Sequence, residues 1–417
     1  MNSYFSKEDS FFTSAIITNG FDILEEHSLI KDEAYCIGSL TKTFIAVAML
    51  ILEEKKLIDI KGNLHDYIPE FNKLTDTKVP IKVEHLLNHT SGLITQSKIN
   101  INSREELVKL LNYDKIQLKI NSDDLYEPGR HFHYSNLAYA YLGILIEVVS
   151  KQKLEDFLNE HILNPLNMKR TTISSEHSSK LRTGHMRYKD KQIPVPIESF
   201  GYYRAAGGMI STISDLKKWM AFLLYNTNNL LKEEQFKKLF NFSKIDHDFT
   251  KITGLALYQT LNKESHHIGH HGKTGGFSTF FGLLEDHKLG VIILSNTSSI
   301  DLFNIGCNIV RDLRIQNMTI EEKKILNHLK VLLPIINTKS KNYRSLFSHA
   351  FINAVGGEEK LYDQLIFEFH KNGQINNFSK CKKIGPNSFI LETNSKKQIT
   401  IYFSEEEYPK LDGIYIN

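Results

Sequence analysis

The sequence is poor in cysteine and tryptophan and has no long apolar run. Its 417 residues include three cysteines, an odd and sparse set that predicts no disulfide framework and a reducing compartment. The longest apolar stretch, residues 44–52, is far shorter than the ~20 residues that span a bilayer. The N-terminal residues include acids where a signal peptide would be basic and then apolar. We therefore expect a cytoplasmic protein without a membrane span.

An excess of charge of one sign is also missing. Lys and Arg total 51 against 48 Asp and Glu, a net charge of +3, so nucleic acid is not an expected partner. Apolar residues make up 41% of the chain and charged residues 24%, which is typical of a globular protein. A chain of this length predicts one large domain or two moderate ones.

The apolar pattern alternates near both chain ends and is helical between them. A hairpin is predicted at 11–24 around Asn19-Gly20, and strands at 277–284 and 289–295. Helices are predicted from residue 40 and at 81–91, 104–112, 136–150, 212–224 and 301–313. The predicted fold is α+β: one antiparallel sheet built from both chain ends and covered by a helical insertion.

The pattern changes after Gln316. Residues 319–322 form a capping box that opens a helix running towards Pro334. Strands are predicted at 365–369, 388–392 and 399–403, with a turn at Asn372-Gly373. We therefore expect a first domain at 1–316 and a small appended domain containing β-structure at 317–417.

The pattern Ser-x-x-Lys occurs five times, beginning at Ser28, Ser39, Ser150, Ser214 and Ser379. In a lysine-rich chain most copies are solvated serines near solvated lysines. Only Ser39-Leu40-Thr41-Lys42 lies where strand-like sequence gives way to a buried helix, which would place the hydroxyl and the amine on one face.

Such a pair has the parts of an activated nucleophile. A serine hydroxyl needs a base to take its proton, and a lysine is a base only if burial or nearby cations lower its pKa. A serine at a helix start also gains a backbone N–H that stabilises an oxyanion.

A second candidate element is the Pro128-Gly129 loop that leads to Tyr134, Ser135 and Asn136 at the start of a predicted helix. Tyr134 is suited to relaying a proton, and the Asn136 amide to orienting a lysine and a substrate carbonyl. The alternative is structural: Asn136 or Ser135 caps the helix while Tyr134 packs.

A third element is the glycine- and histidine-rich stretch 269–278. Gly272-Lys273-Thr274 resembles the end of a phosphate-binding loop, but position 267 is His rather than Gly and a strand follows. His266, His267, His270 and His271 are potential metal ligands, but glycines and the strand break any helical spacing, so no metal or other cofactor is predicted. The remaining alternative is a glycine-rich hairpin edge.

Together these elements resemble the serine β-lactamase and penicillin-binding-protein superfamily, and within it the class C-like serine hydrolases, which share related motifs. Supporting segments follow in order, among them 83–93, Leu142-Gly143 with Glu147, 165–168 and 206–212. The resemblance covers about residues 11–312.

The resemblance assigns a role to each element. Ser39 would be the nucleophile, with Lys42 and Tyr134 sharing the proton transfers and Asn136 contacting the acyl group. Counted back from Gly276-Phe277, the third motif falls on His270-His271-Gly272 rather than on the literal Lys273-Thr274-Gly275.

In that alignment His270 and Gly272 would bind substrate, and His270 would change charge near neutral pH. The strand that carries them would lie beside Ser39, so the backbone N–H groups of Ser39 and Lys273 would form the oxyanion hole.

The predicted function is a serine hydrolase that forms an acyl-serine intermediate on an amide, an ester or a D-residue peptide. The partner would be a small-molecule or peptide substrate, and the sequence predicts no oligomeric state. One alternative is an acyltransferase or a peptide-releasing or cyclising thioesterase using the same residues. Another is a non-catalytic binding homologue, which the complete set of candidate residues disfavours.

Overall fold

The computed structural model of the chain describes most of residues 1–317 and four strands near the C-terminus. The described residues are 1–317, except 7–8, 10–11, 29–32, 70–78, 96–126, 174–180, 246–250 and 261–265, together with 378–385, 388–393, 398–403 and 411–416. The chain divides into two compact units, one comprising Met1–Thr260 and His267–Arg311, the other Leu261–His266 and Asp312–Asn417. The boundary after Gln316 stays a prediction.

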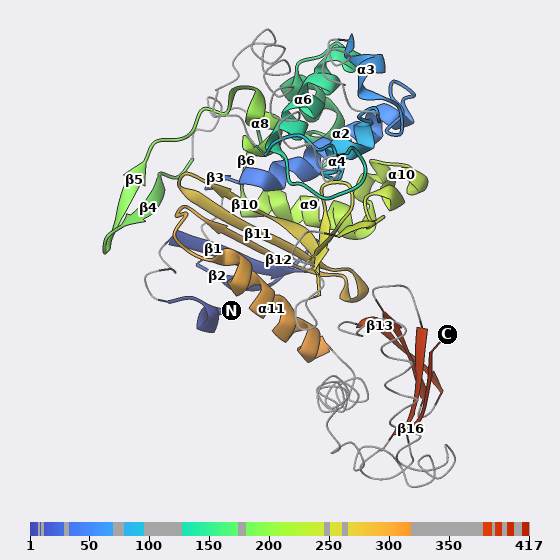
Figure 1. Ribbon diagram of the computed structural model, residues 1–417. Helices are drawn as coiled ribbons and strands as arrows, with labels where there is room; N and C mark the ends of the chain where they lie inside the picture. The colour runs from blue at the N-terminus through green and yellow to red at the C-terminus, as the bar shows by residue number, and fades with distance from the viewer. Residues whose placement is uncertain are drawn as a thin grey trace. The chain divides into compact units, whose positions relative to one another are not determined.

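The first unit is built on an eight-stranded sheet in which every neighbouring pair is antiparallel (Figure 1). In spatial order the strands are β2 (Ile23–His27), β1 (Thr13–Thr18), β12 (Leu289–Ser295), β11 (Phe277–Leu284), β10 (Ile268–Thr274), β9 (Tyr258–Thr260), β8 (Lys251–Thr253) and β7 (Lys244–Ile245). The predicted sheet from both chain ends is confirmed, since β1 pairs with β12 from Thr13 opposite Ser295 onward.

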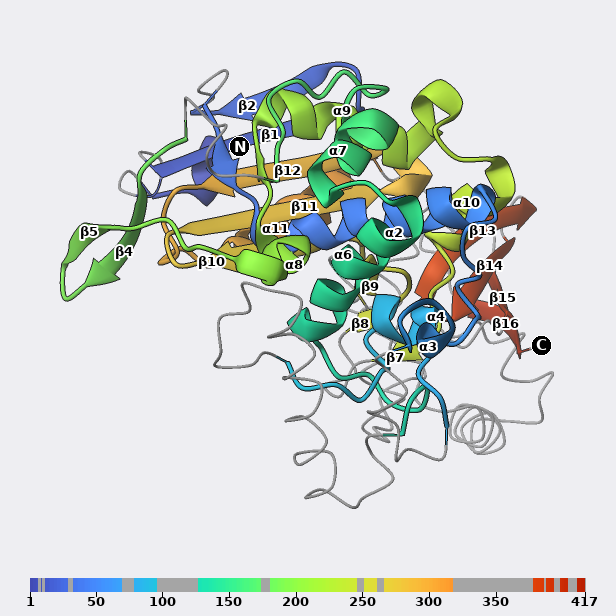
Figure 2. The same cartoon turned by 90° about the horizontal axis from the view of Figure 1, so that it is seen from above.

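Helices cover both faces of this sheet (Figures 1 and 2). On one face lie the long helices α2 (Thr41–Glu54) and α9 (Ile213–Tyr225), with α6 (Asn136–Ser150) packed on α2. On the other face α11 (Leu302–Asn317) brings Phe303 against His271 and Phe280. Shorter helices complete the helical insertion: α3 (Leu64–Tyr67), α4 (Val83–Leu87), α7 (Leu154–Leu158), α8 (Arg204–Gly207) and α10 (Glu233–Lys238).

Helix α2 is the centre of the core. Every residue from Thr41 to Leu52 is buried, as expected for a helix that is apolar nearly all round. Phe44 stacks on Trp219 with ring centroids 3.9 Å apart, and the indole N–H donates to Thr43 Oγ1 at 3.1 Å. Trp219 is itself fully buried. This packing holds α2, and with it Lys42, in one position.

The helix predicted at 81–91 is shorter than expected. It ends at Leu87, because His89 adopts the left-handed backbone conformation and the Thr90 N–H turns back to His85 O at 2.9 Å. A hairpin that the periodicity did not predict, β4 (Gly184–Tyr188) with β5 (Lys191–Val195), projects from the edge of the first unit (Figure 2). The predicted helices at 104–112 and 319–334, the strand at 365–369 and the turn at 372–373 lie outside the described residues.

The second unit contains a four-stranded antiparallel sheet in the order β13 (Phe378–Gly385), β14 (Ser388–Thr393), β15 (Gln398–Phe403) and β16 (Leu411–Ile416). The strands predicted at 388–392 and 399–403 are β14 and β15. Within the described ranges of both units, none of the helices has the length and apolar character needed to cross a membrane.

Candidate active site

Ser39 lies in a single 3₁₀ turn, η2 (Gly38–Leu40), that runs directly into α2. The turn begins at Gly38 with a φ of +53°, a conformation that favours glycine. One helical turn later, Lys42 places its Nζ 3.0 Å from Ser39 Oγ. The spacing of this one Ser-x-x-Lys copy therefore brings the hydroxyl and the amine into hydrogen-bond distance, as expected.

Lys42 is fully buried and has three oxygen neighbours. Besides Ser39, its Nζ donates to Asn136 Oδ1 and to the Ala206 carbonyl, both at 2.7 Å. Burial lowers the pKa of Lys42 well below its usual value of 10.5. Compared with a solvated lysine, burial thus shifts this side chain towards the neutral amine.

Tyr134 approaches Ser39 from the other side. Its hydroxyl donates to Ser39 Oγ at 2.8 Å, and its ring lies 4.9 Å from Lys42 Nζ, measured to the centroid. Burial raises the pKa of Tyr134 well above its usual value of 10, although the bond to Ser39 opposes part of this shift. Tyr134 is therefore a protonated donor across the neutral pH range.

The loop before α6 separates the two alternatives that the sequence left open. Ser135 is the helix cap, since its Oγ accepts the Ala138 N–H at 3.0 Å and donates to Ile94 O at 2.7 Å. Because Ser135 fills this structural role, the side chains of Tyr134 and Asn136 are directed to Ser39 and Lys42.

Strand β10 passes close to the Ser39 turn. A methyl group on Gly272 would lie 2.1 Å from the Ile37 carbonyl oxygen, and one on Gly38 would lie 2.8 Å from the Lys273 nitrogen. Only glycine permits this approach, which brings the Lys273 N–H beside the turn that carries Ser39. The expected position of this strand relative to Ser39 is the observed one.

His270 pairs across β10 and β11 with the core residue Phe281, so the two side chains lie on the same face of the sheet. Its Nδ1–H donates to the His271 carbonyl at 2.6 Å, which leaves Nε2 as an acceptor when the ring is neutral. Burial, His271 and Lys42 lower the pKa of His270 well below 6.5. The direction of this shift opposes the predicted change of His270 charge near neutral pH, because burial favours the uncharged ring.

Three contributions to this site were not assigned from the sequence. The Ala206 carbonyl binds Lys42, Tyr139 places its ring 5.3 Å from Lys42 Nζ, and His89 stacks on Tyr134 with centroids 4.4 Å apart. All three belong to segments that supported the family resemblance or to the predicted helix at 136–150. That ordered agreement was the available signal, but no local pattern distinguishes these residues from core.

Within the described residues there is no group of three His, Cys, Asp or Glu side chains placed to hold a metal ion.

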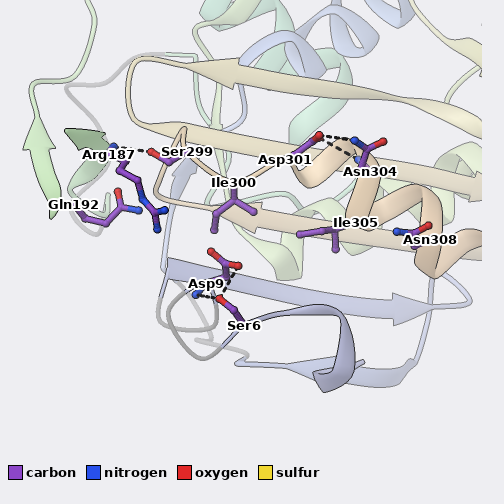
Figure 3. A pocket seen from close by; sticks show the side chains of 10 residues that line it. All are labelled: Ser6, Asp9, Arg187, Gln192, Ser299, Ile300, Asp301, Asn304, Ile305 and Asn308. Carbon is purple, nitrogen blue, oxygen red and sulfur yellow. Dashed lines mark hydrogen bonds between the residues drawn. The ribbon is translucent and has the colours of Figure 1, made fainter. Parts of the chain in front are cut away.

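A cavity of about 600 Å³ lies apart from Ser39, between the N-terminal segment, the β4–β5 hairpin and the start of α11, and Figure 3 shows its largely polar lining. None of the candidate catalytic residues lines it; the lining residues are Ser6, Asp9, Arg187, Gln192, Ser299, Ile300, Asp301, Asn304, Ile305 and Asn308.

Comparison with solved structures shows the same fold. A penicillin-binding protein homologue from Pyrococcus abyssi, described as octameric, matches 98% of this chain and 92% of its own at a TM-score of 0.60 and 20% identity. A class C β-lactamase in complex with cefoxitin matches 73% of this chain and 93% of its own at a TM-score of 0.60 and 18% identity.

Comparison of sequences gives the family. Protein flp of Staphylococcus aureus (strain MW2) is 26% identical over 276 residues, which is 64% of this chain and 53% of that protein, so the chain spans about half the length of this relative. The family model described as Beta-lactamase matches residues 22–306, more than half of the chain. The resemblance found from Ser39, Tyr134 and the third motif is thereby confirmed: this chain belongs to the Beta-lactamase family, within the serine β-lactamase and penicillin-binding-protein superfamily.

Proposed function

We propose that this protein is a serine hydrolase that transfers an acyl group from an amide or ester to Ser39 and then to water. The observation that carries the proposal is that Ser39 Oγ lies within hydrogen-bond distance of both a buried lysine amine, at 3.0 Å, and the hydroxyl of a half-buried tyrosine, at 2.8 Å. A lysine and a tyrosine with shifted pKa values that meet on one partly exposed serine are typical of a catalytic site.

The hydrogen bonds around Lys42 support its role as the base. A neutral Lys42 amine has two N–H groups and one lone pair, and both Asn136 Oδ1 and the Ala206 carbonyl can only accept. In the structure Lys42 Nζ also donates to Ser39 Oγ, so the amine can accept the Ser39 proton only in its deprotonated form. Ser39 Oγ accepts the Tyr134 O–H as well. In this proposal deprotonated Lys42 is the base that activates Ser39, and Tyr134 is a donor.

The reaction follows from this arrangement. Ser39 Oγ attacks the carbonyl carbon while its proton passes to Lys42, and the N–H groups of Ser39 and Lys273 stabilise the resulting oxyanion. The bond to the leaving nitrogen or oxygen then breaks as that atom takes a proton from the Lys42–Tyr134 pair. Water attacks the acyl-serine by the reverse route, which releases a carboxylic acid and restores Ser39.

Substrate contacts would come from Asn136, His270 and Gly272. Because neutral His270 presents only an acceptor at Nε2, it is suited to a hydroxyl, an amide N–H or an amine of the substrate. A carboxylate at this position would meet no charge from His270. The substrate that fits best is a small amide, ester or D-residue peptide whose group beside His270 is uncharged.

Intact-protein mass spectrometry after treatment with a fluorophosphonate, and separately with a penicillin, tests the proposal. We expect one fluorophosphonate adduct, lost in Ser39→Ala and retained in Ser150→Ala. Ser150 begins another Ser-x-x-Lys copy, but its hydroxyl donates to Ile146 O at 2.6 Å within α6. No adduct on folded wild-type protein would refute Ser39 as a nucleophile.

A second step separates hydrolysis from acyl transfer. The acylated protein is incubated in water alone and in a mixture of amines. Release at the same rate in both supports a hydrolase, whereas amine-dependent release with a coupled product supports the transferase alternative.

A further inference from the structure

His89 lies in the left-handed backbone region, which residues other than glycine adopt uncommonly. It follows α4 with a φ of +60°, and the Thr90 N–H donates to His85 O at 2.9 Å, the arrangement in which helices commonly end on a left-handed glycine. A residue with a Cβ is strained there, typically by about 1–2 kcal/mol. The surrounding contacts therefore hold His89 in this conformation.

His89 contacts the Tyr134 ring and is hydrogen-bonded to the residues before and after Tyr134. The imidazole stacks on the Tyr134 ring with centroids 4.4 Å apart and an interplanar angle of 29°. Nδ1 accepts the Ser135 N–H at 3.1 Å, and the His89 carbonyl accepts the His133 N–H at 2.6 Å. The residues before and after Tyr134 are thus fixed to the same histidine that packs on its ring.

These contacts also fix the protonation state of His89. Because Nδ1 accepts a hydrogen bond, the neutral ring carries its proton on Nε2, and a proton on Nδ1 would break the bond to Ser135. The titratable groups around the ring are Lys42 on α2, His133 and Tyr134 in the loop before α6, Tyr139 on α6 and His270 on β10. Burial, Lys42 and His133 all lower the pKa of His89 well below 6.5.

We propose that His89 is a positioning residue that sets the ring plane of Tyr134 and thereby holds the Tyr134 hydroxyl against Ser39. The inference rests on the proposed function of Ser39. It predicts that His89 affects acylation through the Tyr134 hydroxyl and through no other group.

Two variants separate the ring stack from the backbone contact. Asparagine tolerates the left-handed conformation and offers an acceptor but no ring, so His89→Asn should lose some stability to the cavity and, while folded, label with fluorophosphonate about tenfold more slowly. Phenylalanine keeps a ring but leaves the Ser135 N–H unpaired, so His89→Phe should label within about threefold of wild type and melt at a lower temperature. The reverse pattern would overturn the proposal.

A double-mutant cycle shows whether His89 acts through Tyr134. In a Tyr134→Phe background, which lacks the hydroxyl, His89→Asn should change the labelling rate by less than about twofold. Independent, multiplying effects would refute the positioning role. His27→Asn is the matched control, because His27 stacks on Phe5 with centroids 4.3 Å apart outside the Ser39 site, and its removal should leave the labelling rate unchanged.

A spectroscopic measurement judges His89 even if Ser39 proves unreactive. In protein labelled at histidine and tyrosine, NMR should show His89 with its proton on Nε2 and no titration between pH 5.5 and 8. The Tyr134 ring signal, assigned with Tyr134→Phe, should shift in His89→Asn. A His89 that titrates near pH 6.5, or an unmoved Tyr134 signal, overturns this inference, whereas an absent fluorophosphonate adduct refutes only the proposed function.

Discussion

Replacing Gly272 by alanine tests whether the close approach of β10 to Ser39 matters for chemistry. The new methyl group would lie 2.1 Å from the Ile37 carbonyl oxygen, whereas an ordinary contact begins at about 3.4 Å. The strand and the Ser39 turn would have to separate by about 1.3 Å, the difference between these two distances. A displacement of that size removes the Lys273 N–H from hydrogen-bond distance of an oxyanion at Ser39.

The expected loss follows from the loss of one oxyanion donor, which typically costs about 10²–10³ in rate. We expect Gly272→Ala to be labelled by fluorophosphonate about 100-fold more slowly than wild type, with a stability loss of about 1–3 kcal/mol from overpacking. Labelling is followed by intact-protein mass spectrometry well below the melting temperature, so that both proteins are folded.

Gly207→Ala is the control for this experiment. A methyl group on Gly207 faces the same turn, but its nearest neighbour, the Gly38 carbonyl carbon, is 3.6 Å away. This variant should be labelled at close to the wild-type rate. If Gly272→Ala is also labelled within about threefold of wild type while folded, the Lys273 N–H is not an oxyanion donor and the reasoning fails.

Three other outcomes are expected. Burial lowers the pKa of Lys42, and its amine is an unprotonated base above that pKa, so the wild-type labelling rate should fall as the pH drops through the pKa of Lys42. Lys42→Met should remove this pH dependence and lower the rate by about 10² or more. If the rate of Lys42→Met still falls at acidic pH, Lys42 is not the base. His270→Lys introduces a cation beside Ser39 and should raise penicillin labelling relative to fluorophosphonate labelling of Ser39 by about tenfold, measured as a ratio of adduct rates. An unchanged ratio would show that residue 270 does not contact the penicillin carboxylate. Burial and Glu198 raise the pKa of Cys36 to about 12. Iodoacetamide at pH 8 should therefore leave the Cys36 peptide unmodified in folded protein and alkylate it in urea, as measured by peptide mass spectrometry. Rapid alkylation of Cys36 in the folded protein would contradict its burial.

The sequence predicted those parts of the site that depend on local spacing. Ser39 and Lys42 are three residues apart at a helix start, so their proximity follows from helix geometry. The sheet was predicted because alternating apolar segments occur at both ends, and β1 and β12 are those segments. Tyr134 and Asn136 were placed through the order of motifs rather than through any local pattern.

The remaining parts depend on tertiary contacts that no local pattern contains. His89 was read as part of a helix because 81–91 has helical periodicity, and only the fold shows that it terminates α4 and stacks on Tyr134. The charge of His270 was predicted from its ordinary pKa, which the loss of water on burial overrides. The Ala206 contribution is a backbone carbonyl, which any residue type supplies.

The pairing of β1 with β12 has a consequence for how the protein folds. Thr13 and Ser295 are about 280 positions apart, whereas the β11–β12 hairpin turns within a few residues of Leu284 and Leu289. Closing the longer loop costs about 3 kcal/mol more chain entropy than closing one of about ten residues. During synthesis the β1–β2 hairpin is made long before its partner strand exists. This high contact order predicts slow refolding, with fluorophosphonate reactivity of Ser39 returning only when β1 and β12 have paired.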